Sequence, residues 1–132
     1  MIITSAAERK KIPASQQVNI VGRKLYQWLD GAFKFKVSPN MFDVYVTLLY
    51  REPYVKNVSD PEIYEMTLDL NITTYQNKIR VNVIELSPEE RTLGFDVYEP
   101  ESLYNLESGV SLIYKKVCKR ISRAYRDYEF LF

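Results

Sequence analysis

The side chains that most often perform acid–base or nucleophilic chemistry are almost absent from this sequence. The chain of 132 residues contains no histidine, and Cys118 is its single cysteine. Histidine is the usual proton-transfer group near neutral pH, and zinc sites normally need several histidine or cysteine ligands. One cysteine also excludes an intrachain disulfide, which fits a reducing compartment. We therefore expect no catalytic residue, no metal site and no cofactor, and we expect Cys118 to be a small buried side chain.

Two groups of carboxylates could in principle bind a hard cation. Glu89 and Glu90 are adjacent in a predicted turn, and Asp60, Glu62 and Glu65 lie close together in the chain. Neither group has the ligand spacing of a calcium-binding loop. The sequence also contains no glycine-rich phosphate loop and no nucleophile motif. These observations predict a protein that is not an enzyme.

Charge is segregated along the chain. Residues 1–39 contain seven basic and two acidic residues, residues 40–109 contain five and thirteen, and residues 110–132 contain six and two. The basic residues of the last segment occupy a broad arc of a predicted helix: Lys115, Lys116, Lys119, Arg120, Arg123 and Arg126. They could bind nucleic acid or another anionic surface, because cations contact phosphates and the nearby Tyr114 and Tyr125 could stack on bases. The simpler interpretation is that they are solvated or pair with the acidic middle of the chain.

A second candidate surface is aromatic. The chain contains eleven tyrosines and six phenylalanines, and tyrosine suits interfaces because its ring is apolar and its tip is polar. If both terminal helices cover one face of a sheet, the other face exposes apolar side chains to a partner protein or to a second copy of the chain. The residues predicted for this surface are Tyr45, Leu49, Ile84 and Tyr98, with Phe130 and Phe132 added from the C-terminal tail.

The elements that position these residues follow from the spacing of apolar side chains. Spacings of three and four predict one helix over 16–30 and another that begins between 102 and 108. Alternation predicts strands over 33–37, 42–50 and 92–98, and the first of them places three apolar residues on one face and two lysines on the other.

The most specific local pattern is a hairpin over residues 63–86. With Gln76 and Asn77 at the turn, Ile72 faces Val81 on one side, and Thr73 faces Arg80 on the other. Both faces are chemically consistent in this single register, which a slip of one residue would destroy. Because Gln-Asn is not the favoured Asn-Gly pair, the turn could be wider than two residues.

Together these elements predict an α+β fold, an antiparallel meander of about five strands flanked by an N-terminal and a C-terminal helix. The sheet could also curve into a partly closed barrel. We expect residues 1–13 to form a flexible basic arm and residues 14–132 to form one domain. No apolar run is long enough to span a bilayer, so a cytoplasmic protein is expected.

The predicted function is that of a non-enzymatic protein–protein interaction module or a subunit of a larger intracellular assembly. Two alternatives remain at this point. One is nucleic-acid binding through the basic C-terminal helix. The other is binding of an apolar small molecule in a curved sheet, in a cavity lined by Phe35, Val46 and Leu70.

Overall fold

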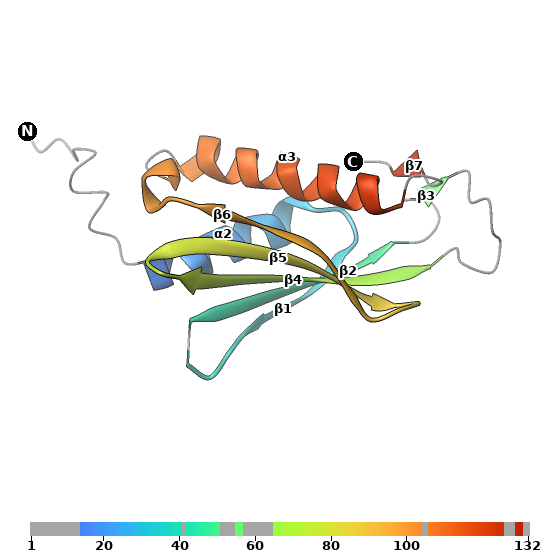
Figure 1. The fold of residues 1–132 in the computed structure, drawn as a ribbon, viewed down its shortest axis with the longest axis horizontal. Coiled ribbons are helices and arrows are strands. Elements are labelled where there is room, and N and C mark those ends of the chain that lie inside the picture. The colour runs from blue at the N-terminus through green and yellow to red at the C-terminus, as the bar shows by residue number, and fades with distance from the viewer. Residues whose placement is uncertain are drawn as a thin grey trace, which may run out of the picture.

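The chain forms a five-stranded antiparallel sheet with two long helices packed against it (Figure 1). The computed structural model describes residues 14–40, 42–50, 55–56, 65–103, 106–125 and 129–130. The predicted arm over 1–13 lies outside these residues. The elements are α2 (Ala14–Trp28), β1 (Ala32–Val37), β2 (Asp43–Tyr50), β3 (Val55–Lys56), β4 (Met66–Tyr75), β5 (Lys78–Ser87), β6 (Arg91–Tyr98), the 3₁₀ helix η1 (Pro100–Leu103), α3 (Leu106–Ala124) and β7 (Glu129–Phe130).

The sheet is an open meander in the order β1-β2-β4-β5-β6. Each strand pairs antiparallel with the next long strand in the chain, which confirms the predicted α+β class and topology. The partial closure considered from the sequence does not occur, because β1 and β6 form the two edges. A separate short pair joins β3 to β7, so the predicted loop over 51–62 contains a strand.

The predicted hairpin is confirmed in its register. Ile72 pairs with Val81, and Thr73 pairs with Arg80. The turn consists of Gln76 and Asn77, where the register placed it, because β4 ends at Tyr75 and β5 begins at Lys78. The wider turn considered from the sequence does not occur. Gln76 and Asn77 both have positive φ angles, of 49° and 61°, the backbone of a two-residue turn that follows the twist of the strands.

One face of the sheet is the hydrophobic core. Every second residue of β2, β4 and β5 is buried there, in the pattern that alternation dictates for a half-covered sheet. The two helices contribute apolar stripes to the same core: Val18, Val21 and Leu25 from α2, and Val110, Ile113, Val117 and Ile121 from α3. Both helices therefore cover the same face, as the sequence predicted.

Two glycines mark the places where α2 fits against the sheet. A side-chain carbon at Gly22 would overlap Val44 and would lie 3.3 Å from the Phe35 ring, so this glycine permits the close approach of helix and sheet that its position in the helix suggested. Gly31 has a φ angle of 89° and follows the helix, where a left-handed residue is needed to end it.

Two details of the edge strands differ from the sequence prediction. A bulge between Ala32 and Lys34 breaks the alternation in β1, so Phe33 is 55% exposed instead of facing the core with Phe35. In β6, Tyr98 pairs with the fully buried Ile79 and is itself only 5% exposed. The prediction that Tyr98 lies on the uncovered face is therefore wrong, because β6 turns this side chain toward the helices.

Candidate functional site

The first candidate site is the face of the sheet opposite the two helices, which we call the open face. Strand register places Lys36, Tyr45, Asn71, Asn82 and Phe95 in one row across all five strands of this face. Ile84 lies on the same face in the next row and Leu49 lies one row further along, and both are partly buried. The predicted positions of Tyr45, Leu49 and Ile84 are therefore confirmed, whereas Tyr98 belongs to the core.

Two apolar residues of the open face were not among those predicted from the sequence. Phe95 is 48% exposed and Val97 is 39% exposed, and they pair with Asn82 and Arg80 respectively. Arg80 and Asn82 point away from the core, so their partners on β6 do so too. The hairpin pattern over 63–86 could not reveal this, because it does not fix how residues 92–98 pair with the hairpin.

A continuous row of polar side chains crosses the centre of the open face. Arg80 Nε donates to Asn82 Oδ1 at 3.0 Å, and Asn82 Nδ2 donates to Asn71 Oδ1 at 3.0 Å. Asn71 Nδ2 in turn donates to Asp43 Oδ1 at 3.5 Å. The row begins with a positive group on β5 and ends with a negative group on β2. The side-chain amides of this row are already hydrogen-bonded to one another. A partner that covers them would therefore leave few buried donors or acceptors without a hydrogen bond.

The positive end of this row is held by aromatic rings. The Arg80 guanidinium carbon lies 3.9 Å from the centroid of Phe95 and 5.5 Å from that of Tyr75. Stacking on aromatic rings holds the guanidinium in one position. The side chain therefore loses less conformational entropy when it binds a partner. Among the residues that the structure describes, Arg80 forms no ion pair.

Beside the row, the open face is hollowed near its β1 edge. The hollow has a volume of about 510 Å³, and Phe33, Lys34, Tyr45, Asp69 and Leu86 are among its lining residues. Thr47 Oγ1 donates to Asp69 Oδ1 at 3.0 Å. Partial burial nevertheless raises the pKa of Asp69 above its ordinary value of 3.8, against the opposing effects of that hydrogen bond and of two lysines.

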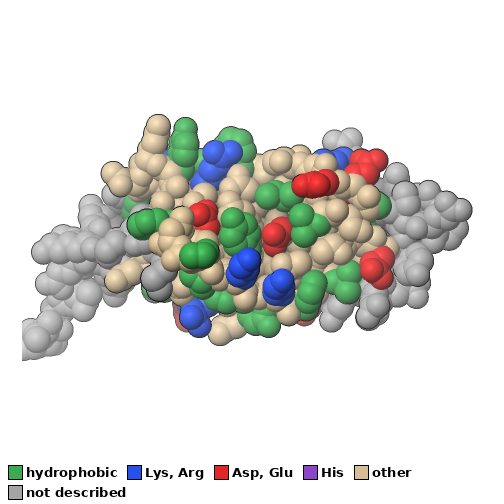
Figure 2. Space-filling model, turned by 90° about the horizontal axis from the view of Figure 1, so that it is seen from below, with side chains coloured by type: hydrophobic (Ala, Val, Ile, Leu, Met, Phe, Trp, Pro, Cys, Tyr) green, Lys and Arg blue, Asp and Glu red, His purple; other side chains and the backbone are tan. Residues whose placement is uncertain are grey.

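The side of the molecule away from α3 is mixed in character (Figure 2). Hydrophobic side chains lie scattered among Lys, Arg, Asp and Glu, and no single apolar area dominates the view. The mixture of apolar and charged side chains is typical of the polar rim of protein–protein interfaces.

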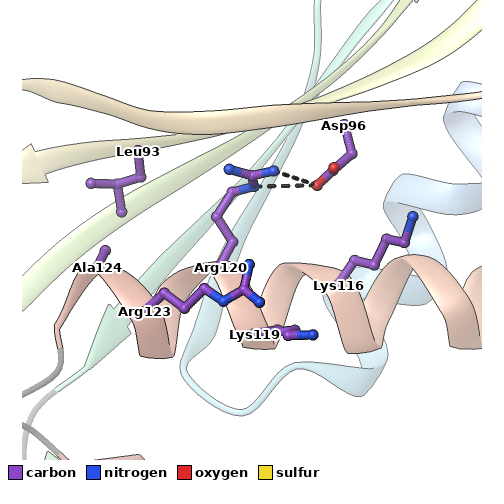
Figure 3. A pocket seen from close by; sticks show the side chains of 7 residues that line it. All are labelled: Leu93, Asp96, Lys116, Lys119, Arg120, Arg123 and Ala124. Carbon is purple, nitrogen blue, oxygen red and sulfur yellow. Dashed lines mark hydrogen bonds and ion pairs between the residues drawn. The ribbon is translucent and has the colours of Figure 1, made fainter.

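The second candidate site is a groove between α3 and β6, which we call the α3–β6 groove (Figure 3). It has a volume of about 360 Å³. Its lining residues are Leu93 and Asp96 from the strand side and Lys116, Lys119, Arg120, Arg123 and Ala124 from the helix. The groove therefore brings together four of the six basic residues that the sequence singled out.

Arg120 is fixed at the centre of the groove. Its Nε and Nη2 both donate to Asp96 Oδ2, at 3.2 and 3.0 Å, and Nη2 also donates to the Phe95 carbonyl at 3.1 Å. The guanidinium lies over Gly94, where any side-chain carbon would overlap it. Figure 3 shows Arg120 extending from the helix to meet Asp96. For this residue, pairing with the acidic middle of the chain is confirmed.

The other groove cations are not neutralised in this way. Lys116, Lys119 and Arg123 form no ion pair within the described ranges, although Lys116 Nζ lies 5.5 Å from the centroid of the buried Tyr98 ring. Four pairs of groove cations are three or four residues apart on one helix, where like charges destabilise by roughly 0.2–0.5 kcal/mol per pair. The groove thus concentrates positive charge at some expense to stability.

The remaining predicted basic and aromatic residues lie elsewhere. Lys115 is exposed on α3 outside the groove lining, and Arg126 lies outside the described residues. Neither predicted stacking ring lines the groove. Tyr114 packs edge-on against Trp28, with ring centroids 6.3 Å apart, and Tyr125 is buried. The expected interleaving of cations and exposed rings is therefore wrong.

Tyr125 instead belongs to a buried polar cluster that ties the end of α3 to the sheet. Its hydroxyl donates to Glu85 Oε1, and Arg91 Nη2 lies 3.2 Å from the same oxygen. The backbone N–H of Glu89 donates to Glu85 Oε2 at 3.1 Å. Both oxygens of this buried carboxylate are satisfied, which is the condition for a charge to remain inside a folded protein.

Cys118 lies on the inner side of α3 and is buried, as the sequence predicted. Burial raises the pKa of its thiol from 9.0 to about 11, although the neighbouring Tyr114 opposes this shift. A thiol with a raised pKa is a poor nucleophile at neutral pH. No group of three or more acidic, cysteine or histidine side chains among the described residues is arranged so that it could hold a metal ion.

The residues predicted for the C-terminal tail surface and for an apolar cavity lie in different parts of the chain. Phe130 lies in β7, where its backbone pairs with Val55, and Phe132 lies outside the described residues. Val46 and Leu70 are fully buried in the core, and Phe35 packs against it. Within the part of the chain that the structure describes, neither helix is long and apolar enough to cross a lipid bilayer.

Comparison with known proteins gives no further guide to these surfaces. Neither the protein-family models, nor the curated proteins, nor the solved structures contain a match to this chain. The open face and the α3–β6 groove are therefore the only guides to function in the described residues.

Proposed function

We propose that the domain is a non-enzymatic interaction module whose open face docks onto the open face of a second copy, so that it acts as the subunit of a homo-oligomeric assembly. The observation that supports this most strongly is the polarity of the row from Arg80 to Asp43. Closed dimers bury the same patch of both subunits, so their contact surface must complement itself.

A twofold axis that runs along β4 makes the row complement itself. Asp43 pairs with Thr73 on β4, and Thr73 pairs with Arg80 on β5, so the two charges lie one strand to either side of the axis. Rotation about it places Asp43 of each copy opposite Arg80 of the other. The same operation sets Lys36 of one copy opposite the exposed Phe95 ring of its partner, a favourable cation–π arrangement.

The size of the open face is consistent with such a dimer. Strands about 4.8 Å apart that rise about 3.3 Å per residue give five strands of eight residues a flat area of roughly 600 Å². Stable interfaces cover about 800 Å² of accessible surface per partner. The accessible surface of the open face is of the same order, because its projecting side chains add area to the flat sheet. Two sheets pack in this way at a separation of about 10 Å.

Binding is proposed in place of catalysis on the basis of the available side chains. The chain has no histidine, and its single thiol is buried with a raised pKa. These features remove the most frequent proton-transfer group and a strong thiolate nucleophile from consideration at neutral pH.

The test is the molar mass in solution, measured by light scattering over a concentration series at low and high salt. We expect a dimer for the natural chain, because apolar contact between the faces persists when salt screens the charges. Asp43→Arg and Arg80→Asp should each shift the protein to monomer, and the variant with both changes should dimerise again. Lys115→Glu, a charge reversal on the exposed side of α3, is the matched control and should stay dimeric.

Two results would contradict the proposal. One is a natural chain that remains monomeric throughout the concentration series. The other is a dimer that survives both single charge reversals unchanged, which would place the contact on another surface. A stable complex with a different protein that covers the open face and excludes self-association would replace the second copy by a heterologous partner.

A further inference from the structure

The α3–β6 groove is distinct from the open face and has a charge pattern that the fold alone does not explain. Lys116, Lys119, Arg120 and Arg123 line it against a single carboxylate, that of Asp96. Lys116 and Arg120 are four residues apart, as are Lys119 and Arg123, so these like charges are neighbours on the helix. Such like-charge neighbours destabilise a helix, and an anionic ligand would remove the repulsion.

The groove also has a rigid centre. Arg120 is held by Asp96 and by the Phe95 carbonyl, and Gly94 leaves the space over the strand in which the guanidinium lies. A cation held in place before a ligand arrives loses less conformational freedom on binding than an unrestrained one. The three other cations surround this fixed group and need only adjust their side chains.

We infer that the α3–β6 groove binds the polyphosphate group of a small ligand. From Lys116 to Arg123 the helix rises about 10 Å, a length that a chain of two or three phosphates occupies. The groove volume of about 360 Å³ falls at the lower end of the range for small-molecule sites. Guanidinium and ammonium groups are the side chains that recognise phosphate oxygens.

Two observations favour a short polyphosphate over a nucleic-acid strand. Only four basic residues line the groove, and the whole chain has a net charge of only +1, whereas nucleic-acid-binding domains usually present a strongly basic face. The groove lining also contains no aromatic ring on which a base could stack. The phosphates could belong to inorganic polyphosphate or to a nucleoside triphosphate, which share the chemistry recognised here.

The experiment is calorimetric titration of the natural chain with tripolyphosphate, with ATP and with a single-stranded oligonucleotide, at low and moderate salt. We expect tripolyphosphate to bind, with an affinity that falls as salt is added. Lys119→Gln and Arg123→Gln should each weaken binding by about tenfold, the usual order for the loss of one charge-assisted contact. Lys115→Gln removes the same charge from the same helix outside the groove and should bind as the natural chain does.

The two sources of phosphate are separated by the ATP titration. Equal affinity for ATP and tripolyphosphate assigns recognition to the phosphates alone, and tighter binding of ATP shows that the nucleoside adds contacts. Either outcome supports the inference.

A measurement of stability distinguishes loss of the binding site from unfolding of the variant. Lys119→Gln and Arg123→Gln should unfold at the same urea concentration as the natural chain or at a slightly higher one, because each removes like-charge repulsion. A stable variant that no longer binds tripolyphosphate supports the inference.

Three results would overturn it. Tripolyphosphate does not bind; or Lys115→Gln weakens binding as much as the groove variants; or the oligonucleotide binds and tripolyphosphate cannot displace it. The last result would identify the groove as a nucleic-acid site. None of these outcomes depends on the oligomeric state, so the inference stands or fails separately from the proposed dimer.

Discussion

The open face and the α3–β6 groove show two different ways of placing charge on one small fold. On the open face, Arg80 and Asp43 end a row of hydrogen-bonded amides, and positive groups on β1 and β5 flank negative groups on β2 and β4. In the groove, four cations face one carboxylate. A balanced, internally bonded surface suits a partner of similar character, whereas an unbalanced one suits a compact ion of opposite sign.

The physical supports of the two regions also differ. The open face is part of the sheet, and its positions are fixed by strand pairing over β2, β4 and β5. The groove depends on how α3 lies against β6, which a few long-range contacts determine. Changes that loosen α3 should therefore affect the groove first and leave the open face largely intact.

The largest effect is expected from Glu85→Ala. This change removes the acceptor that binds Tyr125 and Arg91 and leaves the Tyr125 hydroxyl without that buried partner. A buried donor that loses its acceptor costs about 1–3 kcal/mol, and the change also deletes the hydrogen bonds from Arg91 and from the Glu89 N–H. A loss of about 3 kcal/mol is therefore expected in urea unfolding. Hydrogen exchange should accelerate in the last turns of α3 more than in β2 and β4.

Tyr125→Phe is the milder companion to that variant. It keeps the ring and deletes the hydroxyl, so a cost of about 1–2 kcal/mol is expected. If Glu85→Ala destabilised the protein by less than Tyr125→Phe does, the cluster would not be what ties α3 to the sheet.

Alkaline pH should also weaken the helix side of the molecule. Burial raises the pKa of Cys118 from 9.0 to about 11, and burial raises the pKa values of Tyr98 and Tyr125. A group that holds its proton more tightly when folded stabilises fully below its unfolded pKa, and that stabilisation is lost as the pH rises toward its folded pKa. Unfolding free energy should therefore fall between pH 9 and 11, with Cys118 contributing about 2 kcal/mol.

Urea titrations of the natural chain and of Cys118→Ala at pH 8 and pH 10.5 would measure this contribution. The variant should lose less stability over the interval than the natural chain does. Equal losses would show that the thiol is not the group that titrates.

A smaller effect, of opposite sign, is expected at the centre of the open face. Asp69 lies on β4 and is partly buried, so the proposed twofold axis brings it near its counterpart in the second copy. Asp69→Asn removes this like-charge pair and keeps an acceptor for Thr47. Self-association should become about three- to tenfold tighter, as measured by sedimentation equilibrium. Weaker association of this variant would argue against the axis.

The elements that repeat a local pattern were predictable from the sequence. The β4–β5 hairpin was found in its correct register because Ile72 and Val81 on one side and Thr73 and Arg80 on the other leave only one consistent pairing. Three of the four sheet residues assigned to the open face followed from the same alternation.

The edge strands were not predictable in this way. In β6, apolar residues alternate with Gly94 and Asp96, and the pattern alone does not say which set faces the helices. Arg120 decides this, because its guanidinium lies over Gly94 and pairs with Asp96. That contact joins residues 24 positions apart in the chain, so no local pattern contains it. The bulge that exposes Phe33 in β1 could not be predicted either, because it appears only in the pairing of β1 with β2 and not in the alternation of β1 itself.

The central claim is best tested by mixing two variants that each fail to dimerise. Asp43→Arg has positive groups at both ends of the polar row, and Arg80→Asp has negative groups at both. About the proposed axis, each positive end of one variant meets a negative end of the other. Light scattering should therefore show monomers for each variant alone and a dimer for the equimolar mixture. Monomers in the mixture, from variants that dimerise again when both changes are in one chain, would contradict the proposed packing of the two open faces.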